Sequence, residues 1–167
     1  MAKGAAKNDA NRIKILVRNR RALHDYAIDE RIEAGIALVG SEVKSLRGSR
    51  ASLAEGYVII DGGQAWLMNV QISEYPWASQ QNHEPTRRRK LLLHRREIRK
   101  LDTRVAQRGL AMVPLSIYLK EGKIKVEIGI GKGKRFFEKR ESQKAVDAAR
   151  DIDQALRSDR AGRHRHD

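Results

Sequence analysis

The segment GIGKGKRFFEKR, residues 129–140, combines the residue types best suited to contact a polyanion. Glycines let a partner approach the backbone closely, lysine and arginine attract phosphate, and aromatic rings such as Phe136 and Phe137 can stack on bases. From Ile124 to Gly131, isoleucine and valine alternate with lysine, glutamate and glycine, which predicts a strand that leads into the loop. The pattern therefore indicates an RNA-binding loop at the end of a strand.

Catalytic and metal chemistry find little support in the chain. A P-loop for nucleotide phosphates needs a glycine five residues before its Gly-Lys pair and a serine or threonine after it. Around Gly133-Lys134, Ile128 and Arg135 occupy those two positions. The five histidines form no ligand pair at i, i+4 with a flanking acid, and no two acidic residues form a general acid–base couple. We therefore expect no enzymatic activity, no bound metal and no cofactor.

Basic side chains gather in two more regions. The formal net charge is +14, so a polyanionic partner is the default expectation. Arg87 to Lys90 are four consecutive basic residues and run into three leucines, which can anchor the segment while the charges project. For the helix expected after them, a solvated charged face is the competing interpretation. The basic residues of these regions are Arg95, Arg96, Arg99, Lys100 and Arg104, with Arg18, Arg20 and Arg21 near the N-terminus.

Composition disfavours several classes of protein. No apolar run approaches the roughly 20 residues of a membrane-spanning helix, and no apolar segment of a signal peptide follows the early lysines. The absence of cysteine excludes disulfides and thiolate metal sites. These features favour a cytoplasmic protein without a membrane partner.

Hydrophobic periodicity predicts the elements of the first part of the chain. Residues 1–18 are expected to form a flexible basic leader, although the apolar residues at 13–17 could pack as a short segment. Residues 24–40 alternate with a period of two and predict a strand pair or one long bent strand, in which Gly35 marks a bulge or a close backbone approach. A short helix is predicted over 41–47, with Ser41 as its N-cap and Gly48 at its end.

Turn signals define the rest of the chain. Asp61-Gly62-Gly63 predicts a hairpin between strands at 57–60 and 65–72. A polar loop is expected at 73–86 and a helix at 94–107, and Glu121-Gly122 is expected to join strands at 111–120 and 123–130. In residues 138–167 a thin apolar stripe among charges predicts a tail that is disordered alone and helical when bound.

Together these elements predict a mainly β fold. About six short antiparallel strands, with helices between the hairpins, are typical of small barrels that bind oligonucleotides on an open face. A β-sandwich made from the same strands is the alternative. The expected domains are a flexible basic segment at 1–18, an RNA-binding barrel at 19–137 and a basic tail at 138–167.

Several motifs follow one another in an order that is specific to one family. They are NRRALHDY (19–26), EAGIAL (33–38), SEVKSLR (41–47), RRRKLLLH (87–94), VPL (113–115) and GKGKR (131–135), closing on EKR (138–140). Over roughly residues 18–140 the sequence thereby resembles the SsrA-binding protein family, small protein B, the protein partner of transfer-messenger RNA.

The resemblance implies a six-stranded antiparallel oligonucleotide-binding-type barrel with about three helices and a flexible C-terminal tail. It implies a non-catalytic protein that binds the tRNA-like domain of transfer-messenger RNA, as a monomer at one copy per RNA, and delivers that RNA to stalled ribosomes for trans-translation. The ribosomal A site, mRNA channel and ribosomal RNA are further implied partners, and the tail is expected to become helical in the channel. A general basic ribosomal or RNA-chaperone barrel protein is the alternative function.

The resemblance also implies individual contacts. Asn19 and Glu33 would read base edges or sugar hydroxyls. His24 either contacts RNA or pairs with Asp25, and Leu92 either contacts RNA or packs so that its neighbours are positioned. The expected RNA contacts are Asn19, His24, Glu33, Arg89, Lys90, Leu92, Lys125, Lys132, Gly133, Lys134 and Arg135, and the expected contacts with the ribosomal decoding centre or in the tail are Phe137, Glu138, Lys139 and Arg140.

Overall fold

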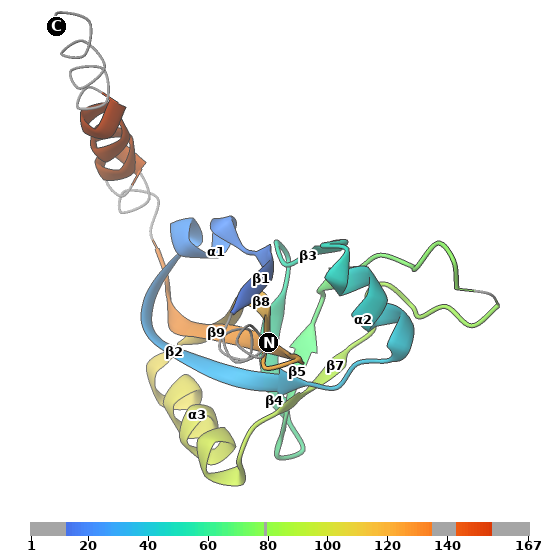
Figure 1. Ribbon diagram of the computed structural model, residues 1–167. Coiled ribbons are helices and arrows are strands. Elements are labelled where there is room, and N and C mark those ends of the chain that lie inside the picture. Colours follow the sequence, from blue (N-terminus) through green and yellow to red (C-terminus); the bar gives the residue numbers. More distant parts are fainter. Residues whose placement is uncertain (1–12, 79, 135–142, 155–167) are drawn as a thin grey trace, which may run out of the picture. The chain divides into compact units, whose positions relative to one another are not determined.

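The computed structural model describes residues 13–78, 80–134 and 143–154 (Figure 1). The chain forms two compact units, residues 1–133 and residues 134–167. In the described part of the second unit, residues 143–154 form a helix whose residues are all exposed. The expected RNA contact Arg135 and the expected ribosome contacts Phe137, Glu138, Lys139 and Arg140 lie outside the described residues.

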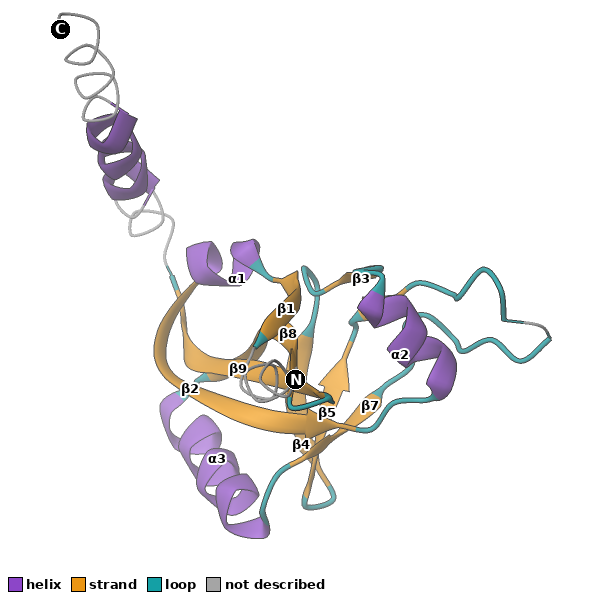
Figure 2. Ribbon diagram, viewed as in Figure 1, coloured by secondary structure: helices purple, strands orange, loops and turns teal. Residues whose placement is uncertain are grey.

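Seven antiparallel strands form one sheet in the first unit (Figure 2). Their order is β1-β8-β9-β2-β7-β5-β4, and β4 packs against β8, so the sheet curls around its core. A separate two-stranded ribbon pairs β3 (Ala51–Ser52) with β6 (Gln71–Ile72). The strands of the large sheet are β1 (Lys14–Arg18), β2 (Tyr26–Ile36), β4 (Tyr57–Asp61), β5 (Gln64–Met68), β7 (Arg89–Leu92), β8 (Ala111–Lys120) and β9 (Lys123–Gly133).

The described residues of the first unit also form three helices, namely α1 (Arg20–Asp25), α2 (Gly40–Arg47) and α3 (Arg95–Arg108). The helix predicted at 94–107 is thus confirmed within one residue at each end. The expectation of a mainly β, antiparallel fold is also confirmed. Six strands and about three helices were expected, whereas the described residues contain nine strands in two sheets, α1 to α3 and the helix at 143–154. No described helix is long and apolar enough to cross a membrane.

The strand β2 is bent by a bulge between Ile28 and Glu30, where its pairing with β9 changes register. The prediction of one long bent strand is therefore confirmed, but the bulge does not lie at Gly35. The backbone at Gly35 is instead closely approached, because a Cβ atom added there would lie 3.0 Å from the Cβ of Leu92. Of the two alternatives predicted for Gly35, a bulge or a close backbone approach, the structure confirms the close approach.

Helix α2 begins one residue earlier than predicted, and Ser41 is not its N-cap. Val39 is the N-cap residue, and Oε2 of Glu42 accepts a hydrogen bond from the Val39 N–H at 2.9 Å. The Ser41 hydroxyl instead bonds Nδ1 of His83 at 2.8 Å. The prediction for Ser41 was wrong because a local capping pattern does not show that a histidine far along the chain competes for the hydroxyl. Gly48 follows the helix as predicted.

Both predicted hairpins are confirmed. Gly62 and Gly63 join β4 to β5 with φ angles of 57° and 71°, and the Glu121-Gly122 turn joins β8 to β9. Such left-handed backbone favours glycine and matches the twist of the paired strands. The second arm of the first hairpin ends at Met68 and not at Ile72, since the residue after Met68 also has a positive φ.

Gly131 lies where β9 passes beside the bulge of β2, and its lack of a side chain is required there. A Cβ atom added at Gly131 would lie 1.9 Å from the carbonyl oxygen of Ala27. We expect Gly131→Ala to lower the free energy of unfolding by about 3 kcal/mol, because β2 and β9 must move apart to admit the methyl group. Urea-induced unfolding followed by circular dichroism measures this change.

Gly133 is the matched control for that prediction. It lies on the same strand with no atom within 4 Å of an added Cβ and without a positive φ. Gly133→Ala should therefore leave the stability unchanged or slightly increased, because alanine restricts the unfolded chain. Equal stabilities of the two variants would contradict the tight approach at Gly131.

Candidate RNA-binding interface

The strands β2, β8 and β9 present a polar outer face around Glu33. Lys125 on β9 stands opposite Gly35 on β2, and because residues two apart on a strand share a face, Glu33 and Lys125 point to the same side. Oε2 of Glu33 accepts hydrogen bonds from the Tyr118 hydroxyl at 2.5 Å and from the Lys120 ammonium at 3.0 Å. The predicted contacts Glu33 and Lys125 are therefore brought together on one surface.

These hydrogen bonds fix the charges on the face. The bonds from Tyr118 and then Lys120 lower the pKa of Glu33 below its ordinary value of 4.5. Burial, and then the Glu33 carboxylate, raise the pKa of Tyr118. At neutral pH Glu33 is therefore ionised while Tyr118 keeps its proton. The partly exposed carboxylate keeps lone pairs that can accept hydrogen bonds from a base edge or a 2′-hydroxyl.

A cavity of about 330 Å³ brings Leu92 next to Lys125. Leu92 ends β7, pairs with Gly35 and is 55% exposed although it is apolar. This exposure leaves the side chain able to contact a partner in addition to the neighbouring backbone. The cavity also includes Arg47 and Lys123, two basic residues that the sequence did not single out.

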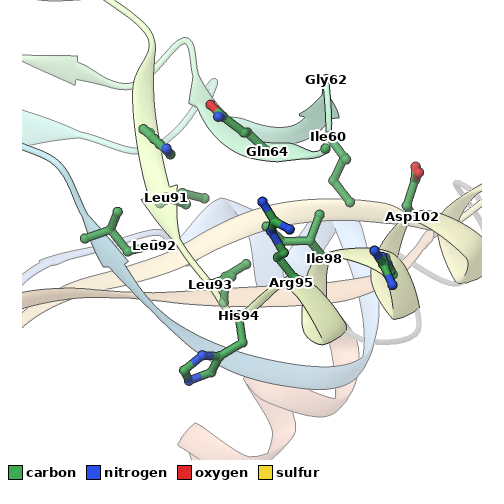
Figure 3. A pocket seen from close by; sticks show the side chains of 13 residues that line it. Ile60, Gly62, Gln64, Leu91, Leu92, Leu93, His94, Arg95, Ile98 and Asp102 are labelled. Carbon is green, nitrogen blue, oxygen red and sulfur yellow. The ribbon is translucent and has the colours of Figure 1, made fainter.

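A larger cavity of about 680 Å³ lies between the β4–β5 turn and α3 (Figure 3). Leu92 lines both cavities, so it stands between them. The basic side chains Lys90, Arg95 and Arg99 line the larger one, and they form no ion pair within the described part of the chain. Unpaired cations around a concave surface are available to phosphate groups.

The basic run from Arg87 to Lys90 divides between the interior and the surface, because its last two residues begin β7 and point to opposite faces of that strand. Arg89 is fully buried, and its guanidinium donates to Oε1 of Glu42 at 2.8 Å and to the carbonyl oxygens of Val70 and Pro85 at 2.8 and 3.0 Å. Lys90, the next residue, faces the larger cavity. The structure therefore places Arg89, an expected RNA contact, where a phosphate cannot reach it.

Glu42 holds this arrangement together from α2. It is fully buried, and Arg87 donates two hydrogen bonds to its carboxylate, at 2.8 and 2.6 Å. Burial alone would raise the pKa of Glu42, but hydrogen bonds from Arg87, the Val39 N–H and Arg89 outweigh it and lower the pKa below 4.5. Burial lowers the pKa of Arg89, although that group stays protonated at neutral pH. The buried charges are thus fully paired.

Asn19 is a second expected contact that is occupied inside the fold. Its side chain is buried, accepts a hydrogen bond from the Ala22 N–H and donates to the carbonyl oxygens of Leu53 and Pro114, both at 2.9 Å. Asn19 therefore caps α1 and ties it to two distant segments. The same short helix carries the exposed His24, whose Nδ1 lies 3.1 Å from Oδ1 of Asp25.

The expected contacts form two groups at opposite ends of β9. Lys132 and Gly133 are exposed where β9 pairs with the start of β2, next to α1 and His24. Lys125 lies seven residues earlier, beside Glu33 and Leu92, which at about 3.3 Å per residue is roughly 20 Å away. Lys134 follows the end of β9. A ligand that contacts both groups must therefore extend along the strand.

The sequence did not indicate Tyr118 and Lys120 as residues of the site. The Tyr118 hydroxyl positions the Glu33 carboxylate, and the Lys120 ammonium balances its charge. Tyr118 and Lys120 are two residues apart on β8, so both lie on the outer face. Their position relative to neighbouring strands depends on the register of β8 with β9, which the Glu121-Gly122 turn sets. Among the described residues, no group of three or more histidine and acidic side chains is placed to hold a metal ion.

A small antiparallel sheet with a cationic outer face, exposed apolar and carboxylate groups and basic cavities defines an RNA-binding β protein. Residues 16–158 match the family described as SmpB protein. The chain belongs to the SmpB family of SsrA-binding proteins.

Relatives and a solved structure agree with this assignment. The chain is 50% identical to the SsrA-binding protein of Sulfurihydrogenibium sp. over 144 residues, covering 86% of this chain and 95% of the relative. It is 46% identical to that of Thermobifida fusca over 157 residues, covering 94% and 98%. It is also similar to a chain of the structure "tmRNA-SmpB: a journey to the center of the bacterial ribosome", with a TM-score of 0.61, 46% identity and coverage of 72% of this chain and 85% of the other.

Proposed function

We propose that this protein binds the tRNA-like domain of transfer-messenger RNA and delivers that RNA to stalled ribosomes, where the nascent chain is tagged and released. The observation that carries the proposal is the match to the SmpB family over residues 16–158. The likeness to a chain from a tmRNA–SmpB ribosome structure supports it. Its work is binding and delivery in the cytoplasm, as a monomer with one copy per RNA, and not catalysis.

Two parts of the interface have different tasks in this proposal. Glu33, Lys125 and Leu92 form the part that reads sugar hydroxyls, base edges and apolar base surfaces. His24 and the loop from Lys132 to Arg135 form the part that contacts the RNA backbone. Lys90 adds phosphate contact at the larger cavity. Asn19 and Arg89 position α1 and β7 from inside, and residues 137–140 contact the ribosome.

The RNA that the protein retains in cells tests the proposal. Tagged protein is purified from its own cells in moderate salt, and the bound RNA is sequenced. One dominant RNA with a tRNA-like, alanine-accepting domain and an internal reading frame is the expected result. A spread of ribosomal RNA fragments or mixed transcripts would overturn the proposal in favour of a general RNA-binding protein.

The loop at the end of β9 has its own expected result. Replacing Lys132, Lys134 and Arg135 together with alanine should weaken binding of this RNA and flatten the dependence of log K on log salt by about one for each lost phosphate contact. Binding titrations at several salt concentrations measure the slope. The control is Lys14→Ala, which removes an exposed charge from β1, a strand that carries none of the expected RNA contacts. An unchanged slope in the triple variant would exclude the loop as a phosphate site.

A further inference from the structure

Two aromatic side chains in the segment 73–86 form a group outside both parts of the interface. The ring of Trp77 is 75% exposed and lies 5.4 Å from the ring of Tyr75, between centroids, at 60°. The Arg50 guanidinium lies 5.7 Å from the Trp77 ring centroid, and the Lys44 ammonium lies 5.3 Å from that of Tyr75. We name these four residues the aromatic platform. None of them lines the two cavities beside β7.

The segment that carries the platform is fixed at its base. The Ser73 N–H donates to the carbonyl oxygen of Arg50 at 3.0 Å, next to the β3–β6 ribbon. The buried His83 bonds the Ser41 hydroxyl and the Ile72 carbonyl oxygen. Figure 1 shows this segment extending from the fold beside α2. The segment that carries Tyr75 and Trp77 is therefore attached to the fold at both of its ends.

Hydrogen bonds also close the segment just below the exposed ring. The amide side chain of Asn82 accepts from the Tyr75 N–H at 3.1 Å and donates to the Tyr75 carbonyl oxygen at 2.9 Å. The Ala78 N–H donates to the same carbonyl at 3.0 Å. This turn fixes the backbone on both sides of Trp77. Little ordering entropy is lost when a rigid aromatic surface binds a partner.

The second tryptophan of the chain, Trp66, differs from Trp77 in its burial. Trp66 lies on β5, is half-buried, and has the Arg88 guanidinium 4.4 Å from its ring centroid. Trp77 instead leaves most of its ring in solvent, so packing does not account for it. The cations at the rings, Lys44 and Arg50, favour an anionic partner.

We propose that the aromatic platform binds one unpaired base of a single-stranded RNA. The base stacks on the exposed face of Trp77, and Arg50 and Lys44 contact the phosphates on either side of it. Aromatic rings stack on any base, and flanking cations follow the backbone, so this site is tolerant of sequence. The site goes beyond the proposed function, because it needs neither a tRNA-like fold nor the face around Glu33.

Fluorescence separates the two tryptophans. In a Trp66→Phe variant the only indole is Trp77, and titration with an eight-residue oligouridylate in low salt is expected to quench it saturably. In the matched Trp77→Phe variant the remaining indole, Trp66, should show no quenching. Trp77→Ala should weaken oligouridylate binding about tenfold, because loss of one stacked base costs about that much, while Trp66→Phe should bind as the unchanged protein does.

Either of two results would overturn the site: absence of quenching of Trp77, or equal oligouridylate affinity of Trp77→Ala and Trp66→Phe. Quenching by a neutral peptide library but not by RNA would overturn it in favour of a protein-binding surface. The capture of structured RNA by the Trp77→Ala variant keeps this test apart from the proposed function. That capture should persist whether or not the platform binds a base, and its loss would place Trp77 in the main interface instead.

Discussion

Replacing Glu42 with glutamine is expected to lower the free energy of unfolding by about 3–5 kcal/mol, because it leaves the buried Arg89 and the partly buried Arg87 without their counter-charge. The carboxylate is fully buried and accepts two hydrogen bonds from Arg87, one from Arg89 and one from the Val39 N–H. A glutamine side chain has the same shape but only one accepting oxygen. Its NH₂ group would face a guanidinium donor, so at least one buried group loses its partner.

Glu55→Gln is the matched control for this change. Glu55 also accepts from an arginine, Arg21, at 2.7 Å, but both side chains are more than half exposed. Exposed pairs contribute about 0–1 kcal/mol, so this variant should be nearly as stable as the unchanged protein. Urea-induced unfolding compares the two. Equal stabilities would show that the buried pair is not required for the fold.

The pH dependence of the free energy of unfolding is a second test of the stabilisation by the Glu42 carboxylate. Because the pKa of Glu42 is lower in the folded protein than its ordinary value of 4.5, the folded state binds protons less readily than the unfolded chain. The stabilisation is therefore fully present above pH 4.5 and is lost as pH falls through the lower, folded-state pKa. The Glu42→Gln variant should lack that part of the acid destabilisation.

A protein truncated after Arg140 is expected to keep its RNA affinity and to lose tagging on stalled ribosomes. In the helix at 143–154, Val146 and Ile152 are 47% and 62% exposed, and with Ala149 they form a thin apolar stripe at a spacing of three. An isolated helix of this length is marginal in water, so its apolar side needs a partner. The partner in this proposal is the ribosomal mRNA channel.

Translation of a message without a stop codon measures that expectation, since tagged product appears only after successful delivery. The double variant Val146→Asp, Ile152→Asp keeps the length of the tail and should reduce tagging strongly. Gln143→Ala changes a polar residue of the same helix and should leave tagging unchanged. If truncation weakened RNA binding as much as the loop replacement does, the separation between RNA-binding and ribosome-binding parts would be wrong.

The parts of the fold that follow from short-range signals were predictable. The turns at Gly62-Gly63 and Glu121-Gly122 predict both hairpins, and the spacing of Ile98 and Leu101 predicts α3. In contrast β1 and β7 are short strands inside basic segments, and they exist because distant strands pair with them. Local sequence carries little information about such pairings.

The candidate interface was predictable in its residue types but less so in its geometry. A basic run shows where positive charge lies along the chain, but not that Arg89 points inward to Glu42, 47 residues earlier, while Lys90 points outward. The base-reading role expected for Asn19 came from the family resemblance, and the sequence does not show that its amide donates to the carbonyl oxygens of Leu53 and Pro114. Long-range packing decided both outcomes.

The pairing of β1 with β8 affects how this protein is made. Lys14 pairs with Leu119, and β8 and β9 are the strands that join β1 to the rest of the sheet. A ribosome that stops before residue 111 therefore produces a chain in which β1 has no neighbouring strand and β2 has lost its partner β9, so their apolar faces are uncovered. Unpaired strand edges recruit other chains and aggregate. Under the proposed function, such unfinished copies are among the nascent chains that the protein itself helps to tag and release.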